Sequence, residues 1–511
     1  MNTLLKGLRE TTNYTYTENG ALTHKSSMNT LIDLFGMGAA YRTRSDEDCI
    51  LLFKKAFEED EKYALKCLFY LRDVRGGQGE RRFFRVVAKW MADHETEAMK
   101  RNLQYIPLFG RYDDLYIFVG TKLEKYAFDF IKSQLMLDMQ SYERNSKEGV
   151  SLLAKWLKSE NTSSSESRML ANKTREAFGM NHKQYRKTLS LLRERINVLE
   201  RLMSANKWDE IEFDKVPSRA GLIYRNAFAR HDIERMKSEK QVRSYEDFMK
   251  DETTTVNAKA LYPYEVVAQA YRLTNDTWFM TPDIDPIQRN AINKYWDNLT
   301  DYFNGCSLDA LCMIDTSGSM WGNEASAPIN VAISLGLYAA ERARGPFAGH
   351  YISFSRHPQL IETEGVDFVD KVYRIYDTNL CENTNIEAAF DMLLDTALKN
   401  HCSQADLPKS IIVISDMEFD AARGYYTFNN NYKTTLMEKI ITKWENAGYK
   451  MPNLVYWNVE ARHNNMPMTV KDGITFVSGF SAVTFEMLMK GKTALDLVYD
   501  KLDSERYACI Q

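Results

Sequence analysis

The chain contains 511 residues and carries a formal net charge of −4, from 66 lysines and arginines against 70 aspartates and glutamates. Its length suffices for roughly two to four domains with a sizeable core. With 44% apolar residues, 12% aromatic residues and only 11 prolines, the composition excludes a disordered or low-complexity chain. Taken whole, the acidic charge also argues against a nucleic-acid-binding protein, which is usually basic.

Membrane segments and disulfides are not expected either. No apolar run approaches the ~20 residues that a bilayer-spanning helix needs, and the N-terminus, MNTLLKGLRE, lacks the apolar core of a signal peptide. The 7 cysteines form no CxxC pair, and the 8 histidines show no HxxxH or HExxH spacing. We therefore expect a reduced cytoplasmic protein without a membrane anchor, a disulfide scaffold or a zinc site.

Residues 1–304 have the pattern of a helical domain. Apolar residues recur at three- and four-residue spacing, with charged residues between them, in segments 46–71, 82–92, 167–178 and 182–204. Short breakers separate such segments, among them the glycine-rich stretch 75–79, Gly179 and Pro217. Many helices joined by short connections are typical of an α-solenoid, so we predict a HEAT-like helical-repeat array, although no repeat of fixed period is visible.

Two clusters of basic residues lie within this helical region. The first contains Arg75, Arg81 and Arg82, next to glycines whose backbone N–H groups can approach an anion. The second spans residues 168–196, where eight lysines and arginines stand against two glutamates over two helices, and Lys183, Arg186 and Lys187 share one helical face. The candidate RNA-contacting residues of this second cluster are Lys173, Arg175, His182, Lys183, Arg186 and Lys187.

The charge is unevenly distributed along the chain. Residues 1–305 hold 48 basic and 44 acidic side chains, a net of +4, whereas residues 306–511 hold 18 and 26, a net of −8. The argument against nucleic acid therefore applies only to the second region, and the charge of the first weakly favours RNA binding. The alternative is that these basic helix faces are simply solvated, as isolated charged runs usually are.

From residue 305 to residue 511 the sequence alternates between strands and helices. Predicted strands lie at 308–314, 349–354, 410–414, 454–458 and 474–477, and the helices between them at 327–344, 386–398, 434–446 and 482–489. This alternation predicts an α/β domain with a doubly wound parallel sheet. Ligands of such sheets bind at the carboxyl ends of the strands.

Oxygen-bearing side chains follow the strands of this predicted sheet. The first strand leads into Asp315-Thr316-Ser317-Gly318-Ser319, a D-x-S-x-S motif, and Asp416 directly follows the strand that ends at Ser415. Hard divalent cations prefer oxygen ligands. We therefore predict a site for Mg²⁺ (or Mn²⁺ or Ca²⁺), with Asp416 acting through a water molecule, at Asp315, Ser317, Ser319, Thr384 and Asp416. The alternative is that these residues only cap helices and tie turns.

No catalytic constellation is predicted. Gly491-Lys492-Thr493 is similar to the end of a phosphate-binding loop, but Glu486 stands where the first glycine is needed. The chain has no G-x-S-x-G motif, and the residue two positions after Asp315 is Ser317 rather than the second aspartate of a phosphatase site. We expect a protein that is not an enzyme.

The set of metal-binding residues resembles the metal-ion-dependent adhesion site of von Willebrand factor A domains. Preceded by a helical region, such a domain resembles the Ro autoantigen family, in which a TROVE module stands first. Locally, Gly179-Met180-Asn181-His182-Lys183 resembles the G-x-x-H-K helix start of that family, while residues 72–82 and 153–165 depart from it, as in a divergent branch. We predict a TROVE-like domain over residues 1–304 and a von Willebrand factor A-like domain over residues 305–511.

This resemblance implies a ring of helical repeats closed by the A domain. Such a ring binds small structured RNAs on a basic outer face and takes the single-stranded ends of misfolded RNAs into its central hole. We expect a monomeric, cytoplasmic ribonucleoprotein scaffold whose metal ion accepts an Asp or Glu carboxylate from a protein partner. The alternative function is a protein-interaction platform that uses the A domain, with the helices acting as a scaffold without RNA.

Overall fold

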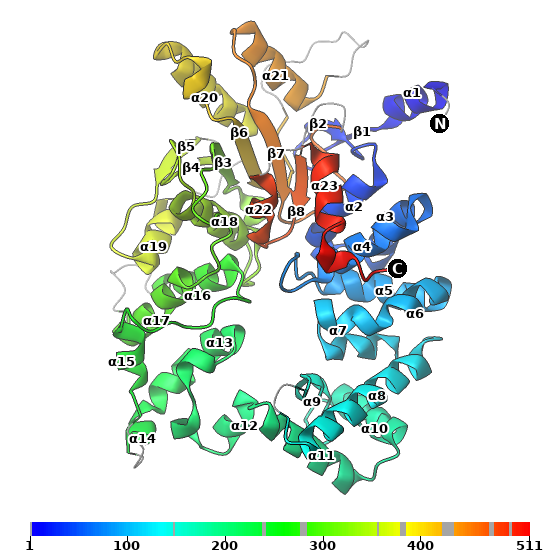
Figure 1. Ribbon diagram of the computed structural model, residues 1–511. Coiled ribbons are helices and arrows are strands. Elements are labelled where there is room, and N and C mark those ends of the chain that lie inside the picture. Colours follow the sequence, from blue (N-terminus) through cyan, green and yellow to red (C-terminus); the bar gives the residue numbers. More distant parts are fainter. Residues whose placement is uncertain are drawn as a thin grey trace.

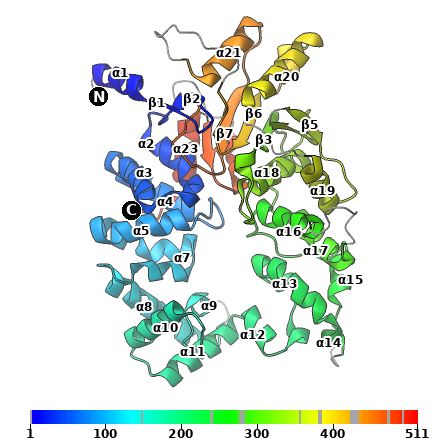
Figure 2. The same ribbon diagram turned by 180° about the vertical axis from the view of Figure 1, so that it is seen from behind.

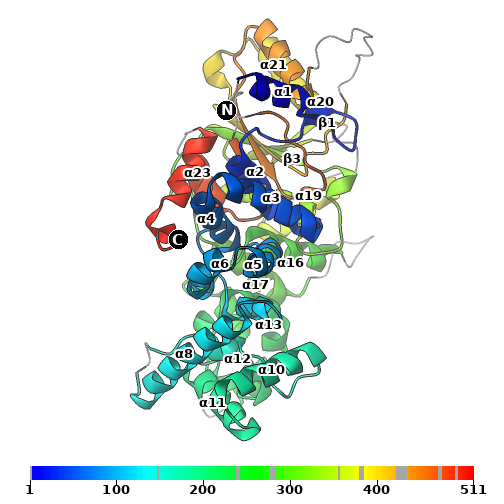
Figure 3. The same ribbon diagram turned by 90° about the vertical axis from the view of Figure 1, so that its right-hand side faces the viewer.

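The computed structural model describes residues 3–146, 149–237, 242–275, 284–354, 357–378, 385–421, 434–469, 475–489 and 493–511. It consists of a helical half, which the chain builds first, and an α/β half with a six-stranded sheet (Figure 1). Figure 3 shows that the molecule is elongated, with the sheet near one extreme and helices α10 and α11 near the other.

The helical half opens with helix α1 (Thr3–Thr12) and a small hairpin of strands β1 (Tyr14–Tyr16) and β2 (Leu22–His24). Figure 1 shows the following helices descending one side of the molecule as far as α8, crossing below, and rising along the other side from α13 to α17. Their bounds are α2 (Thr30–Met37), α3 (Asp46–Glu59), α4 (Glu61–Arg72), α5 (Arg82–His94), α6 (Thr96–Asn102), α7 (Ile106–Phe109), α8 (Glu124–Glu143), α9 (Leu153–Trp156), α10 (Ser165–Phe178), α11 (His182–Arg195), α12 (Leu199–Ser204), α13 (Ser218–Arg230), α14 (Asp232–Met236), α15 (Tyr245–Lys250), α16 (Pro263–Asn275) and α17 (Pro286–Asp297).

These helices form where the apolar residues follow helical spacing and where the ends are capped. In α5, Phe83, Val87 and Met91 recur at four-residue intervals and are completely buried. Helix α10 ends at Gly179, whose φ of 71° is the left-handed conformation that a C-terminal cap needs. The next helix starts at Asn181, whose side chain accepts a hydrogen bond from the backbone N–H of Gln184. The predicted helices over residues 167–178 and 182–204 therefore exist, the second as α11 and α12.

The α/β half contains one mixed sheet with the strand order β5-β4-β3-β6-β7-β8. All neighbouring pairs are parallel except β4 and β5. Its elements are β3 (Ala310–Asp315), α18 (Pro328–Arg342), β4 (His350–Phe354), β5 (Gln359–Glu362), α19 (Phe368–Thr378), α20 (Ile386–Lys399), β6 (Ser410–Ser415), α21 (Leu436–Asn446), β7 (Asn453–Asn458), β8 (Thr475–Ser478), α22 (Val483–Leu488) and α23 (Ala494–Leu502). This arrangement is compatible with the predicted A-type domain.

Three elements of this half are absent from the sequence prediction, namely β5, α19 and α23. Strand β5 is a short edge strand with three of its four residues exposed, so it lacks the apolar run that marks β3 and β6. The predicted parallel sheet is thus confirmed for five strands and corrected by an antiparallel sixth. Helix α18 lies on β3, β4 and β6, and a Cβ atom at its Gly336 would stand 1.8 Å from Ile314 Cδ1, so glycine permits this close packing.

The helical half begins and ends against the α/β half (Figures 1 and 2). At its start, α2 packs against β7, β8 and α23. A Cβ atom at Gly36 of α2 would lie 2.8 Å from the Cβ of Phe476 in β8, which shows how closely the two halves approach. At the other end, α16 packs against α18 and α19. The sheet domain therefore holds both ends of the helical array.

The hairpin of β1 and β2 ties the N-terminal segment to the loops that follow β6 and β7. We call residues 14–24 the N-terminal strap. The Thr17 hydroxyl donates to the Phe419 carbonyl at 2.6 Å, and the backbone N–H of Glu18 donates to the Glu418 carboxylate at 2.6 Å. His24 and Met466 exchange two backbone hydrogen bonds of 2.9 and 3.0 Å. The first residues of the helical half thus lie on the α/β half.

Within the described residues, no helix combines the length and apolar composition needed to cross a bilayer. The cysteines in that part of the chain are free thiols. They are Cys49, Cys67, Cys306, Cys312, Cys402 and Cys509.

Candidate functional site

The first candidate site lies where strands β3 and β6 end. We call it the sheet-edge site, and its described residues are Asp315, Ser317, Ser319 and Asp416. Asp315 ends β3 next to Ser415, the last residue of β6, because Ile314 and Ile414 are paired in the ladder. The Ser415 hydroxyl donates to the Asp315 carboxylate at 2.5 Å, and the Ser317 N–H donates to its other oxygen at 2.9 Å.

The electrostatic balance of this site is acidic. Asp315 is completely buried, and burial together with the negative charge of Asp416 raises the pKa of its carboxyl to about 7. Asp416 is also buried, and one of its oxygens accepts a hydrogen bond of 2.6 Å from Arg462. The Arg462 guanidinium pairs with Asp416, and within the described residues no cation forms an ion pair with Asp315. The two carboxylates carry negative charge that this part of the protein does not fully neutralise.

The donor atoms at this edge fit a hard divalent cation. Ser317 Oγ and Ser319 Oγ lie 3.1 Å apart, beside the Asp315 carboxylate, so two hydroxyls and a carboxylate are grouped. Such a set of oxygens suits Mg²⁺, Mn²⁺ or Ca²⁺, and a cation there would relieve the unfavourable burial of negative charge. Asp416 is held by Arg462, a partner that the sequence analysis did not identify. Thr384 lies outside the described residues.

A second polar cluster adjoins the sheet-edge site. Glu418 is buried, and its carboxylate accepts a hydrogen bond from the backbone N–H of Glu18 at 2.6 Å and lies 2.9 Å from His463 Nδ1. The ligand atoms of Glu18, Glu418 and His463 lie within 4.8 Å of one another. Arg462 bridges the two clusters, because it contacts both Glu18 and Asp416. The N-terminal strap thus supplies a carboxylate to the border of the sheet-edge site.

The second candidate site is a cavity of about 1520 Å³. Its wall is built mainly by the helical half, from α4 and α5 through α9, α11, α12 and α13 to the segment before α16. The α/β half contributes Glu324, Ser326 and Phe480. The cavity is therefore lined by segments from most of the helical array and by the domain that holds its two ends.

The cavity wall is strongly basic. Twelve lysines and arginines line it against five glutamates. The basic residues are Arg42, Arg72, Arg75, Arg81, Arg82, Arg111, Lys155, Arg186, Arg193, Arg201, Arg219 and Lys259. Aromatic side chains lie among them, namely Trp156, Tyr185, Tyr224, Tyr262, Tyr264 and Phe480. Of the residues predicted to contact RNA, Arg75, Arg81, Arg82 and Arg186 belong to this wall.

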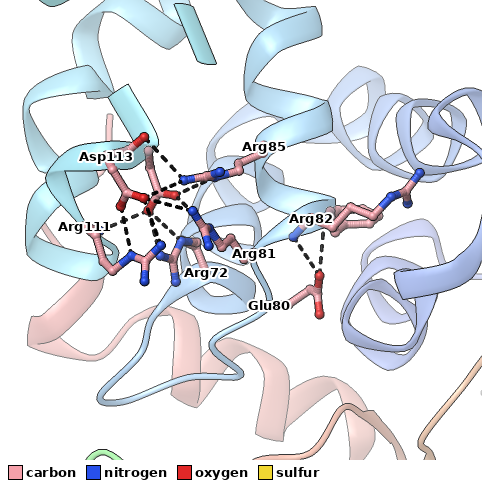
Figure 4. A network of polar contacts seen from close by, with 9 residues as sticks. Arg72, Glu80, Arg81, Arg82, Arg85, Arg111 and Asp113 are labelled. Atoms are coloured by element: carbon pink, nitrogen blue, oxygen red, sulfur yellow. Dashed lines mark hydrogen bonds and ion pairs between the residues drawn. The ribbon is translucent and has the colours of Figure 1, made fainter. Parts of the chain in front are cut away.

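Three arginines of the wall, Arg72, Arg81 and Arg111, belong to a larger group. Together with Arg85 they converge on two aspartates, and we call this group the arginine cluster: Arg72, Arg81, Arg85 and Arg111 with Asp113 and Asp114 (Figure 4). Arg72 and Asp114 form a buried ion pair of 2.6 Å. Arg82 points away from this group in Figure 4 and pairs with Asp46 at 2.6 Å. The sequence analysis identified Arg81 but did not include Arg111, because only the fold brings residue 111 beside this group.

The other predicted RNA contacts divide into paired and unpaired residues. Lys173 pairs with Glu124 at 2.5 Å, whereas Arg175 and His182 both contact Glu160, at 3.0 and 2.7 Å. Lys183, Arg186 and Lys187 are exposed on α11 and make no ion pair within the described residues. Of these three, Arg186 lines the cavity. Helix α11 therefore presents basic side chains both to the cavity and to solvent beside it.

Comparison with known proteins places the chain in a family. The model of the family described as Domain of unknown function (DUF2828) matches residues 17–120 and 150–306, more than half of the chain, so the protein belongs to this family. The family described as Domain of unknown function (DUF7788) matches residues 309–507. Neither description names a function.

Two individual proteins match nearly the whole chain. An uncharacterized protein of Acanthamoeba polyphaga mimivirus, L728, is 28% identical over 514 residues, which cover 94% of this chain and 85% of the viral protein. Among solved structures, the RO (RSR) protein of Deinococcus radiodurans matches 94% of this chain and 100% of its own, with 12% sequence identity and a TM-score of 0.40. The resemblance to the Ro and TROVE proteins stays a prediction.

Proposed function

We propose that the protein is an RNA-binding scaffold of ribonucleoprotein particles. In this proposal the helical half closes into a ring against the α/β half, and the cavity holds a single-stranded segment of a small non-coding or misfolded RNA. The observation that carries the proposal is the wall of this cavity, in which twelve basic residues face five acidic ones across about 1520 Å³. Cavities for drug-sized ligands usually measure about 300–1,000 Å³, so this one suits a larger polyanion.

The mixture of side chains in the wall favours RNA over an acidic protein. Phosphate groups bind lysine and arginine with a large contribution from counterion release. Bases additionally stack on aromatic side chains and on guanidinium planes, and Trp156 and Tyr224 offer such surfaces between the basic residues. Because the wall combines both features, we propose that it recognises the backbone and base faces of a single strand rather than its sequence.

Helix α11 extends the same surface outside the cavity. Lys183 and Lys187 are exposed there, next to Arg186 in the wall. We propose that these two lysines contact the phosphates of a structured RNA whose single-stranded end enters the cavity. Lys173, Arg175 and His182 would join them only after releasing Glu124 and Glu160, their present partners.

Fluorescence anisotropy with an RNA hairpin that carries a single-stranded tail tests this function. We expect binding that weakens steeply with salt, and a decrease in affinity of about tenfold or more in the cavity variant Arg186→Glu/Lys259→Glu. The matched control is Lys399→Glu/Lys450→Glu, which makes a comparable charge change at exposed lysines of the α/β half. No salt-sensitive binding, or equal losses in the two variants, would contradict the proposal.

The sheet-edge site supports a second candidate function, that of a protein-interaction platform. We propose that Asp315, Ser317 and Ser319, with Thr384 and water-linked Asp416, hold Mg²⁺ (or Mn²⁺ or Ca²⁺), whose open position accepts an Asp or Glu carboxylate of a partner. The observation in favour is the pair of buried, incompletely neutralised carboxylates beside two hydroxyls. Titration calorimetry with MgCl₂ tests it: wild type should bind, Ser317→Ala should bind more weakly, and absence of Mg²⁺ binding to wild type would count against it.

A further inference from the structure

The arginine cluster carries more positive charge than its own aspartates neutralise. Arg111 holds Asp113 through two hydrogen bonds of 2.9 Å, and Arg85 and Arg72 hold opposite oxygens of Asp114 at 2.7 and 2.6 Å. Arg81 adds a fourth guanidinium, at 2.9 Å from Asp113. Four guanidinium groups thus share two carboxylates, which leaves two positive charges in excess.

The neighbouring acid does not remove this excess. Glu80 is buried, and it interacts electrostatically with both Arg42 and Arg72. The negative charge of Glu80 and the positive charge of Arg42 cancel, so the arginine cluster keeps its excess of two positive charges. Burial, followed by the nearby charges of Arg85 and Arg111, lowers the pKa of Arg81 to about 10, which is the response of a cation held among other cations.

The excess charge is accessible from the cavity. Arg72 is only 2% exposed and serves to hold Asp114, whereas Arg81 and Arg111 are 43% and 26% exposed. Arg72, Arg81 and Arg111 all line the cavity wall. Arg81 and Arg111 therefore present positive charge to the cavity. The buried ion pair of Arg72 and Asp114 holds the cluster in position behind them.

Free hydrogen-bond donors accompany the charge. A guanidinium group carries five N–H donors in a planar fork. Within the described residues, the Nη1 groups of Arg81, Arg85 and Arg111 make no hydrogen bond. The Arg111 guanidinium also lies over the Trp156 ring, 4.1 Å from its centre, and this cation–π contact helps to hold the side chain in place. Arginine forks held in place in this way suit the oxygens of a phosphate group.

We propose that Arg81 and Arg111, with Arg85 behind them, bind a phosphate monoester on the cavity wall, namely the terminal phosphate of an RNA strand. A monoester carries a charge of about −1.5 to −2 at neutral pH and three acceptor oxygens, which match the excess of two positive charges. An internal phosphodiester carries only one negative charge. The assignment to RNA rests on the proposed function, whereas the binding of a phosphate dianion does not.

The first experiment uses inorganic phosphate as the probe. Thermal unfolding is measured in phosphate and in chloride at equal ionic strength, for wild type, Arg81→Gln and the control Arg101→Gln. Arg101 is 44% exposed, pairs with Glu61 at 2.6 Å and does not line the cavity. We expect phosphate to raise the melting temperature of wild type and of Arg101→Gln but not that of Arg81→Gln. Arg81→Lys, which keeps the charge without the fork, should give an intermediate response.

The second experiment uses three oligoribonucleotides of one sequence, with a 5′-phosphate, with a 3′-phosphate, or with hydroxyl groups at both ends. We expect one phosphorylated form to bind wild type about tenfold more tightly than the hydroxyl form. Arg81→Gln should remove this difference, so that the phosphorylated forms bind this variant no more tightly than the hydroxyl form does.

The two experiments separate the two proposals. If no RNA binds but phosphate stabilises the protein through Arg81, the RNA function fails and the phosphate site stands. Equal binding of the three RNAs, with no Arg81-dependent effect of phosphate, overturns the phosphate site and leaves the RNA function intact. An equal loss of affinity for all three RNAs in Arg81→Gln assigns the cluster to internal phosphates and also overturns the proposal.

Discussion

The sheet-edge site and the arginine cluster are unbalanced in opposite directions. At the sheet edge, one of two buried aspartates pairs with an arginine, and burial and the charge of Asp416 raise the pKa of Asp315 to about 7. In the arginine cluster, of which Arg72, Arg81 and Arg111 line the cavity, four arginines share two aspartates, and burial with the nearby charges of Arg85 and Arg111 lowers the pKa of Arg81 to about 10. Each region is held together by ion pairs between arginine and aspartate. The sheet-edge site has too little positive charge to balance its aspartates, and the arginine cluster has too little negative charge to balance its arginines. The comparison teaches that one chain can present a cation site and an anion site built from the same side chains in different proportions.

The largest effect on stability is expected from the buried ion pair of the arginine cluster. Arg72→Met leaves Asp114 buried without its main partner and should lower the free energy of unfolding by about 3–5 kcal/mol, measured by urea denaturation. The control Arg81→Gln, which removes a half-exposed arginine from the same cluster, should cost about 1 kcal/mol or less. Equal losses in the two variants would show that the buried ion pair of Arg72 and Asp114 contributes no more to stability than the half-exposed Arg81, which would contradict this prediction.

Divalent cations should act on the sheet-edge site alone. We expect saturating Mg²⁺ to raise the free energy of unfolding of wild type by about 1–3 kcal/mol, as for a ligand that binds only the folded state. Asp315→Ala should abolish this gain, and Asp395→Ala, an exposed acidic residue on α20, should retain it. A gain that persists in Asp315→Ala would place cation binding elsewhere.

The pH dependence of stability should reveal an acid in the cavity wall. Burial raises the pKa of Glu265, although Arg219 lies 3.1 Å away. As the pH rises from about 4 toward neutrality, the unfolded chain loses this proton first, so the folded state holds more protons and becomes less stable. The slope for one proton is at most about 1.4 kcal/mol per pH unit. Glu265→Gln should remove this contribution in unfolding measurements across pH 4–8, whereas the exposed Glu364→Gln should not; identical profiles of Glu265→Gln and wild type would contradict it.

The smallest effect is expected outside the cavity. Lys183→Glu/Lys187→Glu should weaken binding of a structured RNA severalfold and reduce the salt dependence, with a slope change of about 1.8 if both lysines contact phosphates. Binding of a short single strand should stay close to that of wild type, because its contacts lie in the cavity. A larger loss than in Arg186→Glu/Lys259→Glu would move the main RNA surface from the cavity to the face of α11.

The sequence predicted those parts of the molecule that depend on local patterns. The apolar runs of β3 and β6 predict these two strands from local pattern alone, and with them the positions of Asp315 and Asp416 at strand ends. The hydrogen bond between Ser415 and Asp315, in contrast, joins residues 100 positions apart. The glycine at 179 marks the boundary between α10 and α11 for the same local reason. Such features follow from residue types within a few positions of one another.

The parts that escaped prediction depend on distant contacts. Arg111 joins the arginine cluster because α7 and the turn after it pack against α4 and α5. Arg462 reaches Asp416, and Glu18 reaches Glu418, across 46 and 400 residues of sequence. No periodicity or spacing records such pairs, so the electrostatic balance of both sites is visible only in the folded chain.

The N-terminal strap also sets an order of events during synthesis. Its partners in the α/β half lie 399 to 443 residues further along the chain. At about 5–20 residues per second, a ribosome needs roughly 20–80 s to supply them. The strap therefore emerges early but acquires its partners only when β6 and β7 have been made. Contacts of such long range slow folding, and these cannot be complete before residue 466 has been made.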